Sequence, residues 1–244
     1  MVGIVIQARM GSERLPGKIL RPIGGKPLLA HVIDRVRAVP NAETVVVATT
    51  HYQRDDVVEG FCRDYGVKCY RGSESNVLDR YIKTAQRYGI KDIVRVTADC
   101  PLIDPLLIQT AISVHFKEKA DFTRGPSQEL IPRGLGAAVV KTSVLRKVAY
   151  EMPLEPYHKE HVTIFIKEHP ELFKIAQYDV PSTYYRPYRL TVDTEEDLEL
   201  IQKIYAKLYQ PGYIIPIPEV ISLLDQDPQL AAINKHVRQK PVRP

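Results

Sequence analysis

The chain has 244 residues, of which 44% are hydrophobic and 26% charged, and its 34 Lys and Arg against 29 Asp and Glu give a net charge of +5. Such a chain can bury a sizeable core as one domain, alone or with a small appendage. It carries no dense Lys/Arg block, no secretory signal and no apolar stretch of about 18 residues, so we expect neither a nucleic-acid partner nor a membrane span. Three cysteines without metal-ligand spacing (Cys62, Cys69 and Cys100) favour a reducing, cytoplasmic setting.

Strand and helix patterns alternate through the first half of the chain. Apolar runs predict strands over 3–8, 44–50, 67–72 and 92–104, the last running into a proline-bounded loop. Amphipathic runs predict helices over 26–39, 55–66 and 76–89, with Asn76 as the N-cap and Gly89 as the stop of the third. This order predicts an α/β fold whose mostly parallel sheet has helices on both faces and gathers ligands at the carboxyl ends of its strands.

The second half of the chain is less regular. We expect a polar loop over 124–135, a strand at 137–140, helices over 142–151 and 158–169, a strand over 172–180, a strand leading into a long helix over 188–209, and a proline-rich tail with a final helix near 228–239. The resulting division is an α/β domain at 1–210 and a helical tail at 211–244, packed on the domain or on a partner subunit.

The loop after the first strand concentrates positive charge. Arg9, Arg14 and Lys18 accompany Gly11 and Gly17, and glycines at such a turn let backbone N–H groups approach phosphate oxygens. The spacing is neither G-x-G-x-x-G nor the Walker pattern. An anion site and a solvated basic loop both remain open on spacing alone.

Several motifs resemble one family from end to end. "QARMGSERLPGKILRPIGGKPLLAHVIDR", "FCRDYGVKCYRGSESNVLDRY", "DIVRVTADCPLIDP", "EHVT", "YRLTVDTEEDLELI" and "DPQLAAINKHVRQK" together resemble the SpsF-like cytidylyltransferases of spore-coat polysaccharide biosynthesis. More distant relatives are the synthetases for CMP-3-deoxy-manno-octulosonate and CMP-sialic acid. The resemblance implies a nucleotide-diphosphosugar-transferase-like three-layer α/β/α fold with a mixed, mostly parallel sheet, and CTP as the bound anion.

The resemblance also implies which residues bind the nucleotide. Arg9 and Lys18 would act on the phosphates and stabilise charge during catalysis. The full nucleotide-binding set is Ala8, Arg9, Gly11, Ser12, Arg14, Lys18, Arg71, Gly72, Ser73, Arg80 and Asp99. Arg80 lies within a predicted helix, where pairing with neighbouring acids is an equally good interpretation.

Two aspartates follow predicted strands. Asp99 precedes Pro101, and Asp193 precedes "TEED"; carboxylates there suit Mg²⁺, although a turn aspartate and a helix N-cap (Asp193 or Thr194) are the alternatives. The family places metal-binding aspartates at these two motifs, so the resemblance implies Mg²⁺ on Asp99 and Asp193. The reaction implied is attack of an acceptor oxygen on the α-phosphorus of CTP with loss of pyrophosphate.

The acceptor site is expected over the second half. Arg133 suits an anionic group, and Glu160 and His161 lie in "KEHVT", although a helical histidine is often simply packed or at the surface. The chain reads "GLGAAVV" where relatives carry "GLDVEVF", so Gly136 and Ala138 replace two acids and the acceptor differs or the activity is altered. The expected acceptor is a sugar, a sugar acid or a related molecule, and a homodimer is expected from the family. A glycosyltransferase on the same fold and a non-enzymatic nucleotide-binding protein are the alternatives.

Overall fold

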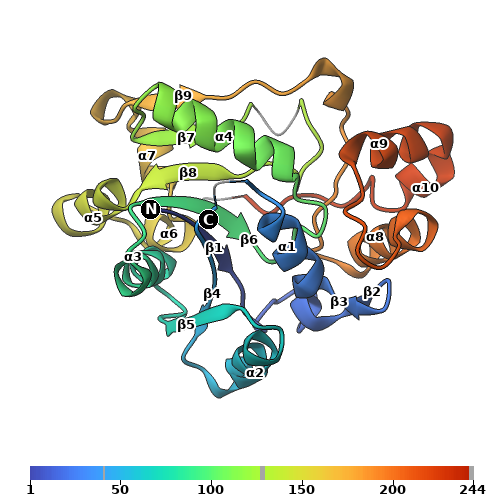
Figure 1. Cartoon of the computed structure of the whole chain (residues 1–244), viewed down its shortest axis with the longest axis horizontal. Helices are drawn as coiled ribbons and strands as arrows, with labels where there is room; N and C mark the ends of the chain where they lie inside the picture. The colour runs from blue at the N-terminus through green and yellow to red at the C-terminus, as the bar shows by residue number, and fades with distance from the viewer. Residues whose placement is uncertain (41, 127–129, 242–244) are drawn as a thin grey trace.

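A computed structural model describes residues 1–40, 42–126 and 130–241. Its central sheet has seven strands in the order β5-β4-β1-β6-β8-β7-β9 (Figure 1). The strands are β1 (Val2–Gln7), β4 (Thr44–Thr50), β5 (Lys68–Gly72), β6 (Asp92–Thr97), β7 (Phe122–Arg124), β8 (Ala138–Lys141) and β9 (Ile175–Gln177). The pairs among β5, β4, β1 and β6 are parallel, as is β7 with β9, whereas β8 is antiparallel to β6 and β7. The predicted mixed, mostly parallel sheet is confirmed.

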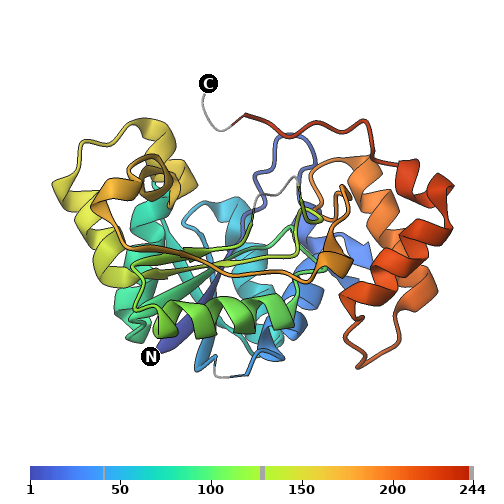
Figure 2. The same ribbon diagram turned by 90° about the horizontal axis from the view of Figure 1, so that it is seen from above.

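Helices cover both faces of this sheet because its strands bury side chains on both sides. Ile4 and Ile6 pack into one core with α1 (Leu28–Arg37), α2 (Asp56–Asp64) and α4 (Pro105–Lys117). Val5 and Ile93 pack into the opposite core with α3 (Val77–Tyr88), α5 (Thr142–Glu151) and α7 (Ile164–Glu168). The three-layer α/β/α arrangement follows, and Figure 2 shows the sheet edge-on between its helices.

Local signals correctly placed several boundaries. The side chain of Asn76 accepts a hydrogen bond from the backbone N–H of Asp79, and α3 ends at Gly89, whose φ is 67°. Helix α1 starts two residues later than predicted because Lys26–Pro27 forms β3, which pairs with β2 (Pro22–Ile23).

The second half departs from the predicted elements. A single helix over 158–169 is wrong: α6 (Pro156–His161) and α7 are separated by Val162, which adopts a φ of 52° and is buried. The strand predicted over 172–180 is only β9, and the one expected from 188 is an isolated bridge between Arg133 and Arg189. The three-residue β7 is too short for a strand period to be read from sequence.

The tail contains more helix than expected. Helix α9 (Ile217–Gln226) lies where a proline-rich stretch was predicted, and the final helix α10 (Pro228–Ala232) ends earlier than expected. Apolar side chains of α9 and α10 join the core that contains α8 (Glu195–Leu208), so this part of the tail packs on its own chain (Figure 1). The boundary at residue 210 stays a prediction. No helix of the described chain is long and apolar enough to cross a membrane.

Candidate active site

A lysine joins two aspartates that are far apart in the sequence. The ammonium nitrogen of Lys18 lies 3.0 Å from a carboxylate oxygen of Asp99 and 2.7 Å from one of Asp193. It also donates to the backbone carbonyl of Val192 at 2.7 Å. The loop after β1, the turn after β6 and the segment before α8 therefore meet at one point, beyond the carboxyl ends of the parallel strands, where α/β sheets bind ligands.

Local backbone geometry delivers each group to this point. Lys18 opens a short 3₁₀ helix (Lys18–Leu20), and Gly17 before it has a φ of 70°, a conformation that favours glycine. The loop is closed by a bond from the backbone N–H of Gly17 to the carbonyl of Met10, 3.0 Å long. Asp99 lies two residues beyond β6 and is held by the last residue of that strand, because the hydroxyl of Thr97 donates to it at 2.6 Å.

The three charges stabilise one another. Burial opposes the charged form of Lys18, but Asp99 and Asp193 outweigh it and the pKa of Lys18 is raised. Burial likewise works against the ionised form of Asp99, yet Lys18 and the Thr97 hydroxyl lower the pKa of this carboxyl to about 2. At neutral pH the centre thus presents one cation between two carboxylates.

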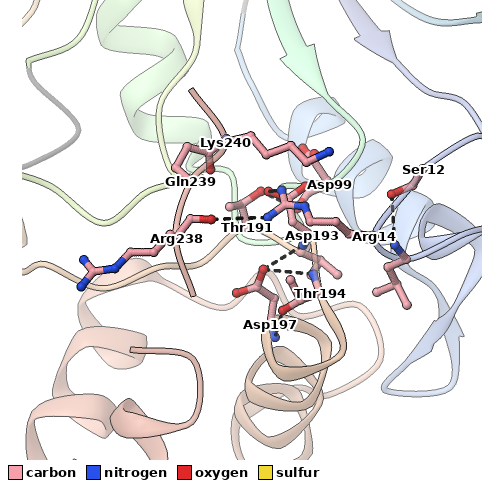
Figure 3. A network of polar contacts seen from close by, with 12 residues as sticks. Ser12, Arg14, Asp99, Thr191, Asp193, Thr194, Asp197, Arg238, Gln239 and Lys240 are labelled. Atoms are coloured by element: carbon pink, nitrogen blue, oxygen red, sulfur yellow. Dashed lines mark hydrogen bonds and ion pairs between the residues drawn. The ribbon is translucent and has the colours of Figure 1, made fainter. Parts of the chain in front are cut away.

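Asp193 is held by two further cations and is not the cap of α8. Its second oxygen lies 2.9 Å from Arg14 (Figure 3) and 2.6 Å from Arg189. The N-cap is Thr194, whose side chain accepts from the backbone N–H of Asp197 in a reciprocal capping box. Of the two interpretations of Asp193, the structure rules out helix capping and leaves a charged group facing the loop after β1.

The loop after β1 is shaped by its neighbours. A Cβ on Gly11 would come within 2.9 Å of the Arg54 guanidinium, so a side chain there would force Arg54 aside. The backbone N–H of Met10 donates to Asp55 at 2.7 Å. Ala8, buried, extends the pairing of β1 with β4, and the Ser12 hydroxyl accepts from the N–H of Leu15 at 3.4 Å.

Arg9 connects the loop after β1 to the loop after β5 and to α6. Its guanidinium lies 3.5 Å from Glu74, in the loop after β5, and 3.8 Å from Glu160 of α6. Arg54 also pairs with Glu74. The predicted nucleotide residue Arg9 and the predicted acceptor residue Glu160 are therefore neighbours.

Two arginines of the predicted nucleotide-binding set, Arg71 and Arg80, are placed differently from one another. Arg71 points away from the loop after β5: it donates to the carbonyls of Thr50 and Tyr52, each at 2.9 Å, and pairs with Asp56 and Glu59 of α2. The side chain of Arg71 therefore fixes the turn after β4 and is not part of the proposed site.

Arg80 is completely buried beneath the same loop. One of its nitrogens donates to the carbonyl of Ser73 at 2.5 Å, while Nε and the other terminal nitrogen have no partner among the described residues. The alternative that Arg80 pairs with neighbouring acids therefore does not hold within the described chain. A Cβ on Gly72 would lie 2.9 Å from Arg80, and the Ser73 hydroxyl accepts from the N–H of Asn76 at 3.0 Å.

The remaining acceptor candidates have different neighbours. Arg133 is half-buried beside Arg189; burial and then this like charge lower the pKa of its guanidinium. His161 is the last residue of α6, next to Glu160, and is half-buried. Gly136 lies against Tyr178, whose hydroxyl would be 2.6 Å from an added Cβ.

Sequence reasoning missed the support beneath Asp193. The buried carboxylate of Asp197 accepts from Arg189 at 2.9 Å and from the backbone N–H of Asp193 at 2.9 Å. Asn234, just after α10, donates to Asp197 at 2.8 Å and to the carbonyl of Arg189 at 2.9 Å. The spacing of four residues from 189 to 193 and from 193 to 197 was the available signal.

The end of the described tail crosses this network. The carbonyl of Arg238 accepts from Arg14 at 3.5 Å (Figure 3). Gln239 accepts from Arg189 at 2.9 Å, and Lys240 pairs with Glu13 at 2.6 Å. The tail thus contacts both the loop after β1 and the segment before α8.

Within the described residues no group of three or more His, Cys, Asp and Glu could hold a metal ion. Two carboxylates, those of Asp99 and Asp193, reach one point. Mg²⁺ is commonly held by one or two carboxylates with water and phosphate oxygens completing its shell. The donor set therefore fits a magnesium ion that arrives with a phosphate ligand. The three cysteines are free thiols.

Comparisons with known proteins identify the family of the chain. A sequence model described as "Cytidylyltransferase" matches residues 3–215, and the chain therefore belongs to the cytidylyltransferase family. The chain is 37% identical over 232 residues to the spore coat polysaccharide biosynthesis protein SpsF of Bacillus subtilis, covering 93% of this chain and 95% of that one.

Two solved structures extend the comparison. A cytidylyltransferase from Leptospira borgpetersenii superposes with a TM-score of 0.89 at 32% identity, covering 98% of this chain and 99% of that one. The CMP:2-keto-3-deoxy-manno-octonic acid synthetase complexed with CTP gives a TM-score of 0.65 at 21% identity, covering 84% and 98%, and supports the fold alone. The family and fold expected from the motifs are confirmed.

Proposed function

We propose that this protein transfers CMP from CTP to a sugar, sugar acid or related acceptor and releases pyrophosphate, as a step in the synthesis of a surface polysaccharide. The observation that carries the proposal is the contact of Lys18 with both Asp99 and Asp193 beyond the carboxyl ends of the sheet. Membership of the cytidylyltransferase family and the likeness to SpsF support the nucleotide and the pathway class.

The phosphates bind at the loop after β1. Lys18, Arg14 and Arg9 are positioned to exchange part of their contact with carboxylates for contact with phosphate oxygens. Because they are preorganised, they stabilise the charge that develops as pyrophosphate leaves without a large rearrangement. The backbone around Ser73, whose carbonyl Arg80 holds from beneath, contacts the cytosine ring or the ribose in this proposal.

Asp99 and Asp193 hold a magnesium ion in this proposal. Magnesium bound with CTP would withdraw charge from the α-phosphate and favour the ionised form of the attacking hydroxyl. The low pKa of Asp99 keeps this carboxylate ionised at working pH, as a metal ligand must be. Asp197 and Asn234 keep Asp193 in place from below.

The acceptor binds across from the nucleotide, near Arg133, Glu160 and His161. Arg133 is positioned to contact an anionic group of the acceptor close to the reacting phosphate, because its neighbours are Arg189 and Asp193. A homodimer and a cytoplasmic location stay predictions. The described residues show no feature that favours a glycosyltransferase, and the "ADCPLID" motif lacks the D-x-D metal pattern of that class.

The direct test is pyrophosphate release with CTP, UTP, ATP or GTP, each with a panel of sugar acids and sugar phosphates and with or without Mg²⁺. We expect release with CTP that depends on both Mg²⁺ and the acceptor. Asp99→Asn should abolish it while the circular dichroism spectrum stays unchanged. Tight CTP binding without turnover across the panel would instead indicate a nucleotide-binding protein, and activity only with a preformed nucleotide sugar would indicate a glycosyltransferase.

A further inference from the structure

Three cations outside the loop after β1, namely Arg95, Arg124 and Lys167, gather at one face of the sheet. Arg95 of β6 pairs in register with Ala138 of β8, and the register of β8 with β7 continues to set Arg124 beside Ala138. Residues paired in register project to the same face of a sheet. That face is the one on which Ile93, Phe122 and Val140 pack against α3, α5 and α7, and Lys167 lies on α7.

These three cations have no carboxylate partners of the kind that pair with the cations of the loop after β1. Within the described residues, Arg95, Arg124 and Lys167 form no ion pair with an acid. The guanidinium of Arg95 donates to the amide oxygen of Gln7 at 3.4 Å, and its Nε is buried without a partner in the described chain. A buried donor without a partner costs free energy that a ligand can recover.

Lys167 responds to the other two charges. Its side chain is at the surface, but surrounding protein removes part of its hydration, and Arg95 and Arg124 add like charge, so its pKa is lowered to about 8. These cations repel one another and have no described counter-charge, so binding an anion would relieve the repulsion. Two arginines can supply paired N–H donors to a phosphate or a carboxylate.

The alanine at position 138 explains why no carboxylate neutralises Arg95 and Arg124. It is paired with Arg95, and the register of β8 with β7, extended by one residue, sets Arg124 on its other side and on the same face. An acidic side chain at this position would stand beside both guanidinium groups and neutralise them. The methyl group of alanine leaves the space and the charge to a ligand.

The cluster lies close to the proposed active site but is separate from the magnesium carboxylates. Arg95 is two residues before Thr97 on β6, a separation of roughly 7 Å along a strand, and the Thr97 hydroxyl donates to Asp99. An acceptor whose attacking oxygen lies near Asp99 can therefore extend along the sheet to Arg95.

We propose that Arg95, Arg124 and Lys167 form a subsite for an anionic group, a phosphate or a carboxylate, at the end of the acceptor distant from its attacking oxygen. This inference rests on the proposed function, because it places the acceptor beside Asp99. It defines the acceptor as a sugar derivative with a negative charge at its far end, and it assigns Ala138 as a specificity-determining position.

The test measures binding, so that it does not depend on turnover. With the nucleotide site saturated by Mg²⁺ and the non-reacting analogue cytidine 5′-(α,β-methylene)triphosphate, glucose, glucose 6-phosphate and glucuronate are titrated by calorimetry, and the mannose series likewise. In at least one series we expect an anionic member to bind about 10-fold more tightly than its neutral parent. The 6-phosphate and the uronate distinguish phosphate from carboxylate.

Variants connect this preference to the cluster. Lys167→Gln removes an exposed charge and should reduce the preference about three-fold or more, and Ala138→Glu should abolish it. Lys117→Gln, an equivalent loss of charge on α4 at the other face of the sheet, should leave it unchanged. If Ala138→Glu does not fold, Lys167→Gln against Lys117→Gln decides the question.

Equal binding of neutral and anionic members in both series would overturn the subsite. So would a preference that persists unchanged in Lys167→Gln. Failure of CTP turnover would remove the proposed function while leaving this binding comparison intact, and turnover with a neutral acceptor alone would leave the proposed function but remove the subsite.

Discussion

Two regions of the molecule carry lysine and arginine side chains: the loop after β1 with the segment before α8, and the face formed by β6, β8 and β7. In the first region these cations are paired with carboxylates, and in the second they are not. Lys18, Arg14 and Arg189 each contact a carboxylate, and Asp193 contacts all three. Arg95, Arg124 and Lys167 have no such partner among the described residues. Paired charges hold a geometry before the ligand arrives, whereas like charges without partners reduce stability until a ligand neutralises them. In the proposed function the paired charges position the phosphates and the unpaired ones select the acceptor.

The largest expected effect comes from breaking the paired region at its centre. Lys18→Ala removes the cation between Asp99 and Asp193, and we expect the rate of pyrophosphate release from CTP to fall about 10²–10³-fold, as when one preorganised group at a developing charge is lost. Lys26→Ala, which removes an ion pair with Asp34 outside the site, is the control and should keep most of the activity. A Lys18→Ala rate within about three-fold of wild type would remove Lys18 from the chemistry.

Acid should weaken the same region. The pKa of Asp99 is lowered to about 2 in the folded protein, below its ordinary value of 3.8, so its contribution to stability is complete above about pH 4 and is lost as the pH falls toward 2. The contribution is of order 2 kcal/mol. Urea unfolding between pH 5 and pH 2 measures it, and Asp99→Asn should show a correspondingly smaller loss. An identical acid dependence in both proteins would show that Lys18 does not stabilise the ionised form.

The support beneath Asp193 is the next target. Asn234→Ala removes one of the donors to the buried carboxylate of Asp197 and the described donor to the carbonyl of Arg189, and should lower the free energy of unfolding by about 1–3 kcal/mol. Gln226→Ala, which removes an exposed bond to Ser222, is the matched control and should have little effect. Equal urea midpoints for the two variants would contradict a supporting role for Asn234.

Sequence reasoning located the centre of the site because local patterns mark strand ends. Lys18, Asp99 and Asp193 each follow or precede an apolar run, and family resemblance related them to one another. Arg71 occupies an equally suggestive place after β5, but its direction is set by the start of α2, where Asp56 and Glu59 capture it. Local secondary-structure propensities do not reveal these ion pairs.

The parts that could not be predicted depend on contacts between distant segments. Asn234 reaches Asp197 only because α10 packs near α8, and no local pattern pairs residues so far apart. The free cluster depends on the register of β8 with β6 and on the position of α7, which sequence reading merged with α6 into one helix. Ala138 was visible in the sequence as a missing acid, while the arginines on either side of it were not.

The smallest expected effect is a change in the free energy of unfolding whose sign differs between the two regions. Lys167→Gln removes a cation that faces Arg95 and Arg124, so it should leave the free energy of unfolding unchanged or slightly increase it, in contrast to Lys18→Ala. Because the pKa of Lys167 is about 8 when folded and 10.5 when unfolded, the unfolded chain binds the additional proton between these values, and wild-type stability should rise with pH across this range relative to Lys167→Gln. Urea unfolding of both proteins from pH 7 to pH 10.5, at low salt to limit screening, measures the difference. A wild-type stability that falls relative to the variant would mean that Lys167 is paired after all, and the contrast between the regions would disappear.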